Sequence, residues 1–182
     1  MTLRALCILH PGFEEIEAIT PIDLLRRAGV EVTVAGIHGI GLVEGKNGIR
    51  VQASESLEEV KEDHFDLILL PGGPGISHIR NHPTLSLLLR NSAEKEVWLA
   101  CICAAPLLLL DAGLIEDLNY TAHPSTIQSL PDAKNEPVVV HRHIITSQGA
   151  GTSTQFSLAL IEALSGKKKA DDIAESICWI QN

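Results

Sequence analysis

The sequence feature that most constrains the fold is a series of short apolar runs, rich in β-branched residues and separated by stretches with helical periodicity. The runs predict strands at Ala5–Leu9, Val30–Ile37, Leu67–Leu70, Val97–Ile102 and Ile144–Ser147. The stretches between and after them predict helices near Glu15–Ala28, Ser56–Val60, Thr84–Ser92, Ala104–Ala112, Thr152–Leu164 and Lys169–Ile180. Continuously apolar strands are typical of parallel sheets covered on both faces. The alternation therefore predicts an α/β fold, a doubly wound sandwich with a mostly parallel sheet and helices on both faces.

The chain is expected to form one domain over residues 1–182. No internal repeat, low-complexity tract or linker divides it, and 45% of its residues are hydrophobic. Aromatic residues make up only 3%, so Leu, Ile, Val and Ala must build the core. The segment Ile40–Val51 contains Gly and Asn at turn spacing, which predicts an accessory antiparallel hairpin.

Charge and the N-terminal sequence limit the partners and the compartment. The formal net charge is −9, which gives no basic surface for nucleic acid or for an anionic membrane. The N-terminal stretch MTLRALCILHPGFEE shows no cleavage site, and no apolar run approaches membrane-spanning length. We therefore expect a cytoplasmic protein whose four cysteines are reduced.

Residues with reactive side chains collect in the loops that follow the predicted strands. In open α/β sheets, ligand sites form beyond the carboxyl ends of the strands. This rule selects five places, namely His10–Glu17, Pro71–Gly75, Cys103–Pro106, His123 with the adjoining proline, and Gly149–Thr152.

The run VWLACICAAP, residues 97–106, predicts a nucleophile elbow. A buried strand ends, one residue turns sharply and a helix begins, and the small residues Cys101 and Ala105 lie two positions on either side of Cys103. In that geometry the Cys103 sulfur projects above the sheet, and the helix N-terminus is expected to lower its pKa. The alternative is that Cys103 is a small buried core residue, as free cysteine often is.

Two further loops supply candidate partners for this sulfur. Gly72 and Gly73 follow the strand DLILL and let backbone N–H groups approach a ligand, although a simple tight turn is an equal alternative. Glu17 lies one turn inside a helix. If it faces the elbow, burial raises its pKa and keeps it protonated, able to donate to the thiolate. Glu14 and Glu15 are explained by the helix dipole alone. His123 precedes a proline at a strand end and is either a general acid/base or a hydrogen-bonded loop residue.

Other histidines and cysteines are interpreted as structural. His141 and His143 alternate along a strand-like run without a third ligand, so we expect no metal site. A disulfide between Cys101 and Cys103 would be strained, because only one residue separates them. Cys7 and Cys178 are expected to pack in the core or between helices.

Five motifs in order, GFEEIE, DLILLPGG, ACICAAP, TAHP and ITSQGAGTSTQFSLALIEALSG, give the chain a resemblance to a known family. It resembles the ThiJ/PfpI superfamily, specifically the DJ-type branch that includes bacterial protein deglycases. The resemblance covers essentially the whole chain and implies a flavodoxin-like sandwich and a homodimer. It matches Cys103 to the family nucleophile, Glu17 to its hydrogen-bonding acid and His123 to the nearby histidine. It matches the N–H groups of Gly73 and Ala104 to the oxyanion donors.

The resemblance also implies binding residues and activities. Gly72 and Arg27 are the predicted binding residues, whereas Asn47 stands where related chains often carry an arginine of an anion pocket. Cys101 stands where a small residue without a thiol is common. Similar members are credited with glutathione-independent glyoxalase activity, deglycation of methylglyoxal or glyoxal adducts, chaperoning and peroxide sensing.

Three functional hypotheses follow. The first is a glyoxalase or deglycase, a hydro-lyase or hydrolase that needs no cofactor and acts on reactive dicarbonyls or glycated amines and thiols. The second is a redox-sensing, chaperone-like stress protein whose Cys103 oxidises to sulfinate. The third is a cysteine peptidase or amidase. In such relatives a histidine usually follows the elbow cysteine directly, but here Ala104 does.

Overall fold

The computed structural model describes residues 2–180, and its centre is a sheet of seven strands in the order β5-β2-β1-β6-β7-β9-β8. These strands are β1 (Arg4–Leu9), β2 (Glu31–Gly36), β5 (Glu55–Ser56), β6 (Leu67–Leu70), β7 (Trp98–Ile102), β8 (Val138–His141) and β9 (Ile144–Ser147). All neighbouring pairs are parallel except β8 with β9, which is antiparallel. The mostly parallel sheet predicted from the sequence is confirmed.

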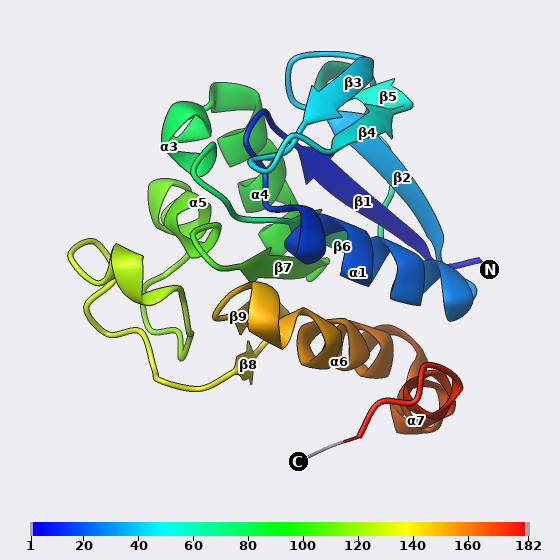
Figure 1. The fold of residues 1–182 in the computed structure, drawn as a ribbon. Helices are drawn as coiled ribbons and strands as arrows, with labels where there is room; N and C mark the ends of the chain where they lie inside the picture. Colours follow the sequence, from blue (N-terminus) through cyan, green and yellow to red (C-terminus); the bar gives the residue numbers. More distant parts are fainter. Residues whose placement is uncertain (1, 181–182) are drawn as a thin grey trace.

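Helices cover both faces of the sheet, so the flavodoxin-like sandwich is confirmed (Figure 1). The helices are α1 (Glu15–Arg27), α2 (Leu57–Val60), α3 (Ile76–Ile79), α4 (Pro83–Glu94), α5 (Pro106–Asp111), α6 (Ser153–Ser165) and α7 (Lys167–Ser176). Two cores lie on opposite faces because successive strand side chains alternate. Cys7 and Leu9 pack with α1 and α6, whereas Leu6 and Ile8 pack with α2, α4 and α5. Figure 1 shows α1 and α6 side by side across the first face.

The predicted hairpin is confirmed as a separate two-stranded antiparallel sheet, formed by β3 (Gly41–Glu44) and β4 (Arg50–Ala53). Its turn lies against the loop between β1 and α1. The N–H of Gly12 donates to the Glu44 carbonyl at 2.8 Å, and the N–H of Lys46 donates to the Phe13 carbonyl at 2.8 Å. The hairpin therefore brings its turn to the N-terminus of α1.

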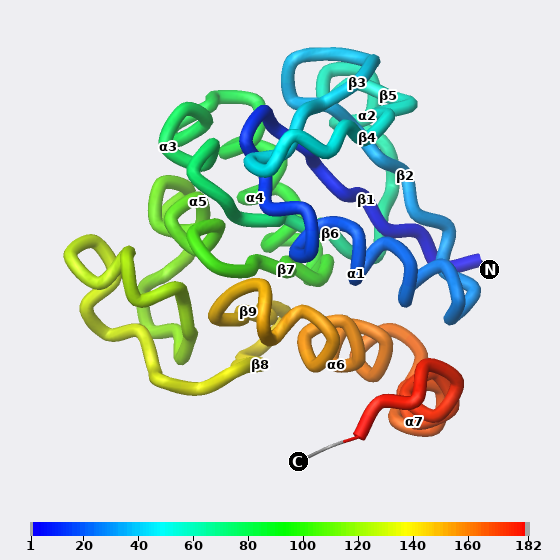
Figure 2. Tube along the Cα trace, in the orientation of Figure 1, coloured from blue at the N-terminus to red at the C-terminus, as the bar shows by residue number. Residues whose placement is uncertain are grey.

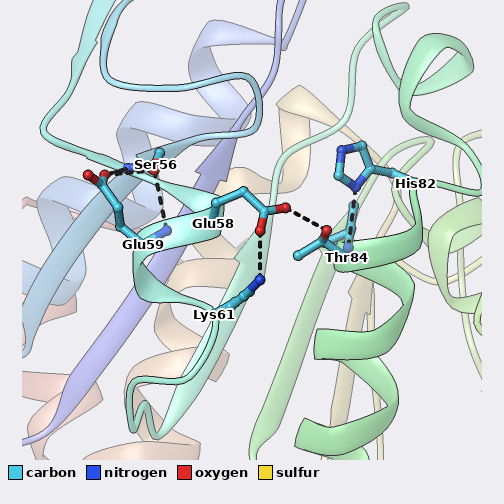
Figure 3. Close-up of polar contacts among 7 residues, drawn as sticks. Ser56, Glu58, Glu59, Lys61, His82 and Thr84 are labelled. Carbon is cyan, nitrogen blue, oxygen red and sulfur yellow. Dashed lines mark hydrogen bonds and ion pairs between the residues drawn. The ribbon is translucent and has the colours of Figure 1, made fainter.

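A polar network on the surface fixes α2 against α4 (Figure 3). Ser56 and Glu59 form a reciprocal capping box at the start of α2. Glu58 accepts from Lys61 at 2.7 Å and from the Thr84 hydroxyl at 2.6 Å, which ties the short helix to the first turn of α4. Such contacts stabilise a four-residue helix that has little stability alone.

A long connection joins α5 to β8 and contains only one short helix, η1 (Pro124–Thr126). Figure 2 traces this segment outside the sheet. Just before His123, this connection pairs with another segment only through a single bridge between Thr121 and Lys134. The sequence pattern predicted neither α3 nor the two-residue β5, because elements this short carry no readable periodicity. No helix in the part of the chain described here is long and apolar enough to cross a membrane.

Candidate active site

Cys103 occupies a strained turn between β7 and α5, as the elbow motif predicted. Its φ angle is 65°, a left-handed conformation that residues with a side chain rarely adopt. Two backbone hydrogen bonds hold the turn in place. The N–H of Cys103 donates to the Ser147 carbonyl at 2.8 Å, and the N–H of His123 donates to the Cys103 carbonyl at 2.9 Å. The elbow is therefore fixed from β9 on one side and from the long connection on the other.

Glu17 reaches the elbow from the first turn of α1. It is 1% exposed, and its Oε2 accepts a hydrogen bond from the Gly72 N–H at 3.0 Å. The Glu14 side chain caps the same helix by accepting from the Glu17 N–H at 2.9 Å. Glu17 is thus a buried acid with a fixed carboxyl group, and the predicted binding residue Gly72 uses its N–H to hold that acid.

Two glycines after β6 make room for this arrangement. A Cβ atom at Gly72 would lie 2.7 Å from both the Cys103 Cβ and the Glu17 Oε2. The Cys103 and Glu17 side chains therefore lie on either side of the position that a Cβ atom of residue 72 would occupy, and only glycine leaves that position empty. Gly73 has a φ of 103°, and a Cβ there would meet the Gly12 carbonyl at 2.5 Å. The glycine turn thus lets α1 and the elbow approach each other.

Burial raises the pKa of Glu17 to about 7. The negative charge of Glu14 adds to this effect, while hydrogen bonding to Cys103 and to the Gly72 N–H, together with the positive charge of Lys46, acts in the opposite direction. A carboxyl group with this pKa is substantially protonated at neutral pH. The sequence prediction of a raised pKa at Glu17 is therefore confirmed.

The predicted lowering of the Cys103 pKa is wrong. Burial, together with the negative charge of Glu17, raises the pKa of the thiol to about 12, although the N–H groups of Gly73 and Ala104 act to lower it. The helix dipole is too small to dominate, because α5 begins only at Pro106 and spans six residues. A negative charge on either side chain disfavours ionisation of the other. Cys103 and Glu17 therefore form a coupled pair that carries a single negative charge above about pH 7. When the proton resides on Glu17, the charge lies on the sulfur.

His123 stands at the exposed rim of the site, at the start of η1. Its Nδ1 accepts from the Ser125 N–H at 3.2 Å and lies 2.8 Å from the Ser125 hydroxyl. This contact places the proton of a neutral ring on Nε2. Gly149 separates the histidine from the acid: a Cβ there would lie 3.4 Å from His123 Cδ2 and 3.7 Å from Glu17 Oε1. His123 is therefore a neighbour of the Cys103–Glu17 pair.

A pocket of about 550 Å³ opens over the sulfur. The reactive end is lined by Glu17, Gly73, Cys103, Ala104 and His123. Two cations also line the pocket, Lys46 from the β3–β4 turn and Arg80 from the residue after α3. Sequence reasoning did not identify either of them as a site residue. The GKNG turn signal was visible for Lys46, whereas no pattern marked Arg80.

Arg27 does not line this pocket. It lies in the last turn of α1, is exposed, and pairs with Asp23 at 2.9 Å. Asn47 donates from its backbone and side-chain nitrogens to the Glu15 carboxylate, at 2.7 and 2.9 Å. The neutral Asn47 therefore fixes the hairpin turn against α1.

The remaining cysteines and histidines differ partly from expectation. Cys7 and Cys101 are fully buried, and all four cysteines are free. Cys178 is exposed, so the expectation that it packs between helices is wrong. His141 ends β8 and accepts from the Asn119 N–H at 2.9 Å, whereas His143 lies in the following turn against the Trp98 ring. Among residues 2–180 no group of three side chains is placed to hold a metal ion.

Comparison with known proteins identifies the family of the chain. The family model described as DJ-1/PfpI family matches residues 3–163. The Drosophila melanogaster protein dj-1beta is 37% identical over 187 residues and covers 100% of both chains, and its crystal structure superposes with a TM-score of 0.94. The structure of Toxoplasma gondii DJ-1, described as oxidized, is 32% identical, covers 99% of this chain and 100% of its own, and has a TM-score of 0.94.

A third relative carries an enzymatic name. The Caenorhabditis elegans protein called glutathione-independent glyoxalase DJR-1.2 is 33% identical over 178 residues, covering 96% of this chain and 95% of its own. Sequence and structure thus agree over the full length of the sandwich. The chain belongs to the DJ-1/PfpI family.

Proposed function

We propose that the chain is a cofactor-independent glyoxalase and deglycase, with Cys103 as nucleophile acting on methylglyoxal, glyoxal or their early adducts. The observation that carries the proposal is the Cys103–Glu17 pair itself, a half-buried sulfur in a fixed strained turn beside a buried carboxyl group whose pKa is about 7. An acid with this pKa both gives and takes protons near neutral pH. The glyoxalase name of one relative supports this choice of reaction.

The reaction begins with the sulfur of the singly charged pair. The thiolate attacks the aldehyde carbon of methylglyoxal, an S–C bond forms, and the carbonyl electron pair moves to oxygen to give a hemithioacetal. The N–H groups of Gly73 and Ala104 are the donors for the developing oxyanion, a contribution of roughly 3 kcal/mol per donor in other enzymes. Glu17 supplies the proton that neutralises this oxygen.

Proton transfer between adjacent carbons completes the conversion. The ionised Glu17 removes the hydrogen from the former aldehyde carbon, and the resulting enediol takes a proton at the neighbouring carbon, with His123 assisting. The product is a thioester of lactate. Water hydrolyses it, the C–S bond breaks, and lactate and the free thiol leave. Methylglyoxal plus water thus becomes lactic acid, with no external oxidant or reductant.

The test is a lactate assay on metal-free protein supplied with methylglyoxal and no glutathione. We expect lactate to form at a rate that the Cys103→Ala variant lowers by about a thousandfold or more. The Cys178→Ala variant is the matched control, since that thiol is exposed and far along the chain at the end of α7. Equal lactate from wild type and Cys103→Ala would refute the proposal.

A second candidate is peroxide sensing through the same sulfur, supported by the relative whose structure is described as oxidized. Two molecules of peroxide would each transfer one oxygen to Cys103 and leave as water, giving a sulfinate. Protonated Glu17 and the two N–H groups would then bind the sulfinate oxygens. Intact-mass measurement during a peroxide titration decides between the candidates. Selective addition of two oxygens at Cys103 with negligible lactate turnover would favour sensing.

We also propose that the chain acts as a homodimer in the cytoplasm. Ile16 and Ile19, one turn apart on α1, are 52% and 42% exposed, and Ile49 in the adjoining hairpin turn is 56% exposed. This apolar group fits a second copy of the chain. Four free cysteines suit a reducing compartment. Light scattering on the Ile16→Glu/Ile19→Glu variant is expected to give a monomer, and an unchanged mass would contradict the interface.

A further inference from the structure

The pocket above Cys103 is much larger than the proposed substrates. Its volume is about 550 Å³, within the range of sites that enclose drug-sized ligands. Methylglyoxal has only three carbons and two oxygens. The part of the pocket that lies beyond the catalytic groups is therefore free to contact the remainder of a longer molecule.

Outside the catalytic groups the lining mixes apolar side chains with polar ones, and one of the polar residues is a cation. The apolar residues are Pro74, Ile76, Leu107 and Ala150, and the polar ones include Ser77, Arg80, Ser125, Thr126, Gln128 and Ser129. Lys46 adds a second positive charge to the pocket. This charge acts on Glu17, because it lowers the pKa of that carboxyl group. Two cations in one pocket stand out in a chain with a net charge of −9. Glu14 and Glu17 also line the pocket, so the attraction of an anionic substrate tail is local to the two cations and is not a property of the whole pocket.

The carboxylate of Asp111 fixes the orientation of the Arg80 guanidinium group. Its Nε lies 2.9 Å from Asp111 Oδ2, and its Nη2 donates to Asp111 Oδ1, which makes the pair bidentate. The Asp111 side chain is 6% exposed and also accepts from the Asn81 N–H, so the carboxylate itself is anchored. The third guanidinium nitrogen, Nη1, has no hydrogen-bond partner within residues 2–180. An arginine held by two nitrogens, with one left over, is well prepared to bind an anion.

We infer that Arg80 is a specificity-determining residue that binds the anionic tail of the substrate, so that the preferred substrates are α-oxoaldehydes carrying a carboxylate at the end opposite the aldehyde. The inference rests on the proposed function and narrows its substrate class. The aldehyde carbon meets the Cys103 sulfur, and the carboxylate accepts hydrogen bonds from Arg80. The hydroxyl groups of the outer pocket solvate the chain between them.

The test compares 4,5-dioxovalerate, an α-oxoaldehyde that ends in a carboxylate, with its neutral methyl ester. We expect wild-type kcat/KM to favour the carboxylate roughly 10- to 100-fold, the size of one charge-assisted hydrogen bond. Arg80→Gln should abolish this preference, mainly through KM, and leave the methyl ester and methylglyoxal within about twofold of wild type. Arg90→Gln, which removes an exposed arginine of α4, is the matched control.

Two results would overturn the inference. One is a wild-type enzyme without preference for the carboxylate, and the other is a loss in Arg80→Gln that is equal for charged and neutral substrates. Because Arg80→Gln leaves Asp111 without its cation, the double variant Arg80→Gln/Asp111→Asn replaces the ion pair by an amide pair. It should show the same loss of preference if the single variant does not fold.

A binding measurement separates this inference from the proposed function. Levulinate has the same ketone and carboxylate but no aldehyde, so it tests the pocket without turnover. Calorimetric titration should detect levulinate binding to wild type and to Arg90→Gln, and about tenfold weaker binding to Arg80→Gln. If the protein turns over no aldehyde, the proposed reaction is wrong. The levulinate titration still decides whether Arg80 forms an anion site, because it does not depend on turnover. Equal binding by Arg80→Gln, or none by wild type, contradicts the site.

Discussion

Two places in this molecule combine a carboxylate with neighbouring donors at the start of a helix, and they differ in burial. At α2, Glu58 and Glu59 are exposed and accept from Lys61, Thr84 and Ser56, which lowers the pKa of both acids (Figure 3). At α1, Glu17 accepts from Gly72 and lies beside Cys103, yet its pKa rises to about 7. The residue type and the helix position are similar, and the environments are opposite.

The difference teaches what makes a carboxylate chemically useful. Water screens the α2 network, so its acids remain ionised and serve only to cap and tie helices. At α1, burial and the charge of Glu14 penalise the Glu17 carboxylate, and burial and the charge of Glu17 penalise the Cys103 thiolate, so the two groups compete for one negative charge. The reactive pair is thus a product of burial and like charge in combination with the strained elbow.

The largest effect is expected when the buried acid is neutralised. Glu17→Gln keeps the side-chain shape and an acceptor for the Gly72 N–H but has no transferable proton, so kcat for lactate formation should fall by roughly 10²–10⁴-fold. Steady-state kinetics with methylglyoxal measure it. Glu58→Gln is the matched control from the exposed network and should retain wild-type kcat. Retention of full activity by Glu17→Gln would remove the acid from the mechanism.

Filling the space between acid and thiol should be the next largest effect, this time on stability. Gly72→Ala places a methyl group 2.7 Å from the Cys103 Cβ and the Glu17 Oε2 and 2.8 Å from the Ile102 carbonyl, so something must move. We expect the free energy of unfolding to fall by about 2–4 kcal/mol. Urea denaturation measures this change, with Gly151→Ala as control because a Cβ there meets nothing within 4 Å. Similar midpoints for the two variants would contradict the tight packing.

The raised pKa of Glu17 also predicts a pH-dependent stability difference. Between the ordinary value of 4.5 and about 7 the folded chain binds more protons at this group than the unfolded chain. The contribution of Glu17 to stability is therefore present below pH 4.5 and is lost as the pH rises through 7. Glu17→Gln lacks this loss, so at pH 8 it should be more stable than wild type by roughly 1–3 kcal/mol, and near pH 4.5 the two should be equal. Parallel pH profiles of the two proteins would show that burial does not penalise this carboxylate.

The smallest effect is expected in the exposed network. Glu58→Gln removes the ion pair between Glu58 and Lys61, in which the Glu58 side chain is 57% exposed and the Lys61 side chain is 40% exposed. Such pairs are screened by water and salt, so neither the urea midpoint nor its salt dependence should change measurably. A clear loss of stability would mean that the surface network does more than tie α2 to α4.

Much of this arrangement could be predicted from sequence because it depends on local patterns. The alternation of strands and helices indicated the parallel sheet, and small residues around Cys103 indicated the sharp turn of the elbow, which the structure shows with a left-handed φ. Glu17 was found because an acid two residues inside an apolar helix face is hard to explain as surface charge. These signals lie within a few residues of the groups they describe.

What could not be predicted depends on contacts between distant segments. The direction of the Cys103 pKa shift reflects partial burial by segments distant in sequence and the charge of Glu17, 86 positions away, neither of which a local motif reports. Arg80 lines the pocket and is paired there with Asp111, the last residue of α5, which is 31 positions away in sequence. Cys178 was misassigned because the last helix was predicted to continue to Ile180, whereas α7 ends at Ser176 and the apolar residues Trp179 and Ile180 beyond it are exposed.

The most direct test of the central claim, that Cys103 and Glu17 share one proton, is site-resolved alkylation with iodoacetamide from pH 5 to 10. Cys178 on the same chain serves as an exposed reference thiol. Although the pKa of the Cys103 thiol is raised, the pair loses its first proton at about pH 7, and the form with the remaining proton on Glu17 carries a thiolate. We therefore predict that Cys103 reacts faster than Cys178 at pH 7.5, that its rate rises through about pH 7 and levels off, and that Glu17→Gln moves the rise to higher pH. A Cys103 that reacts no faster than Cys178, with a rate that climbs only above pH 9 and does not change in Glu17→Gln, would contradict the account.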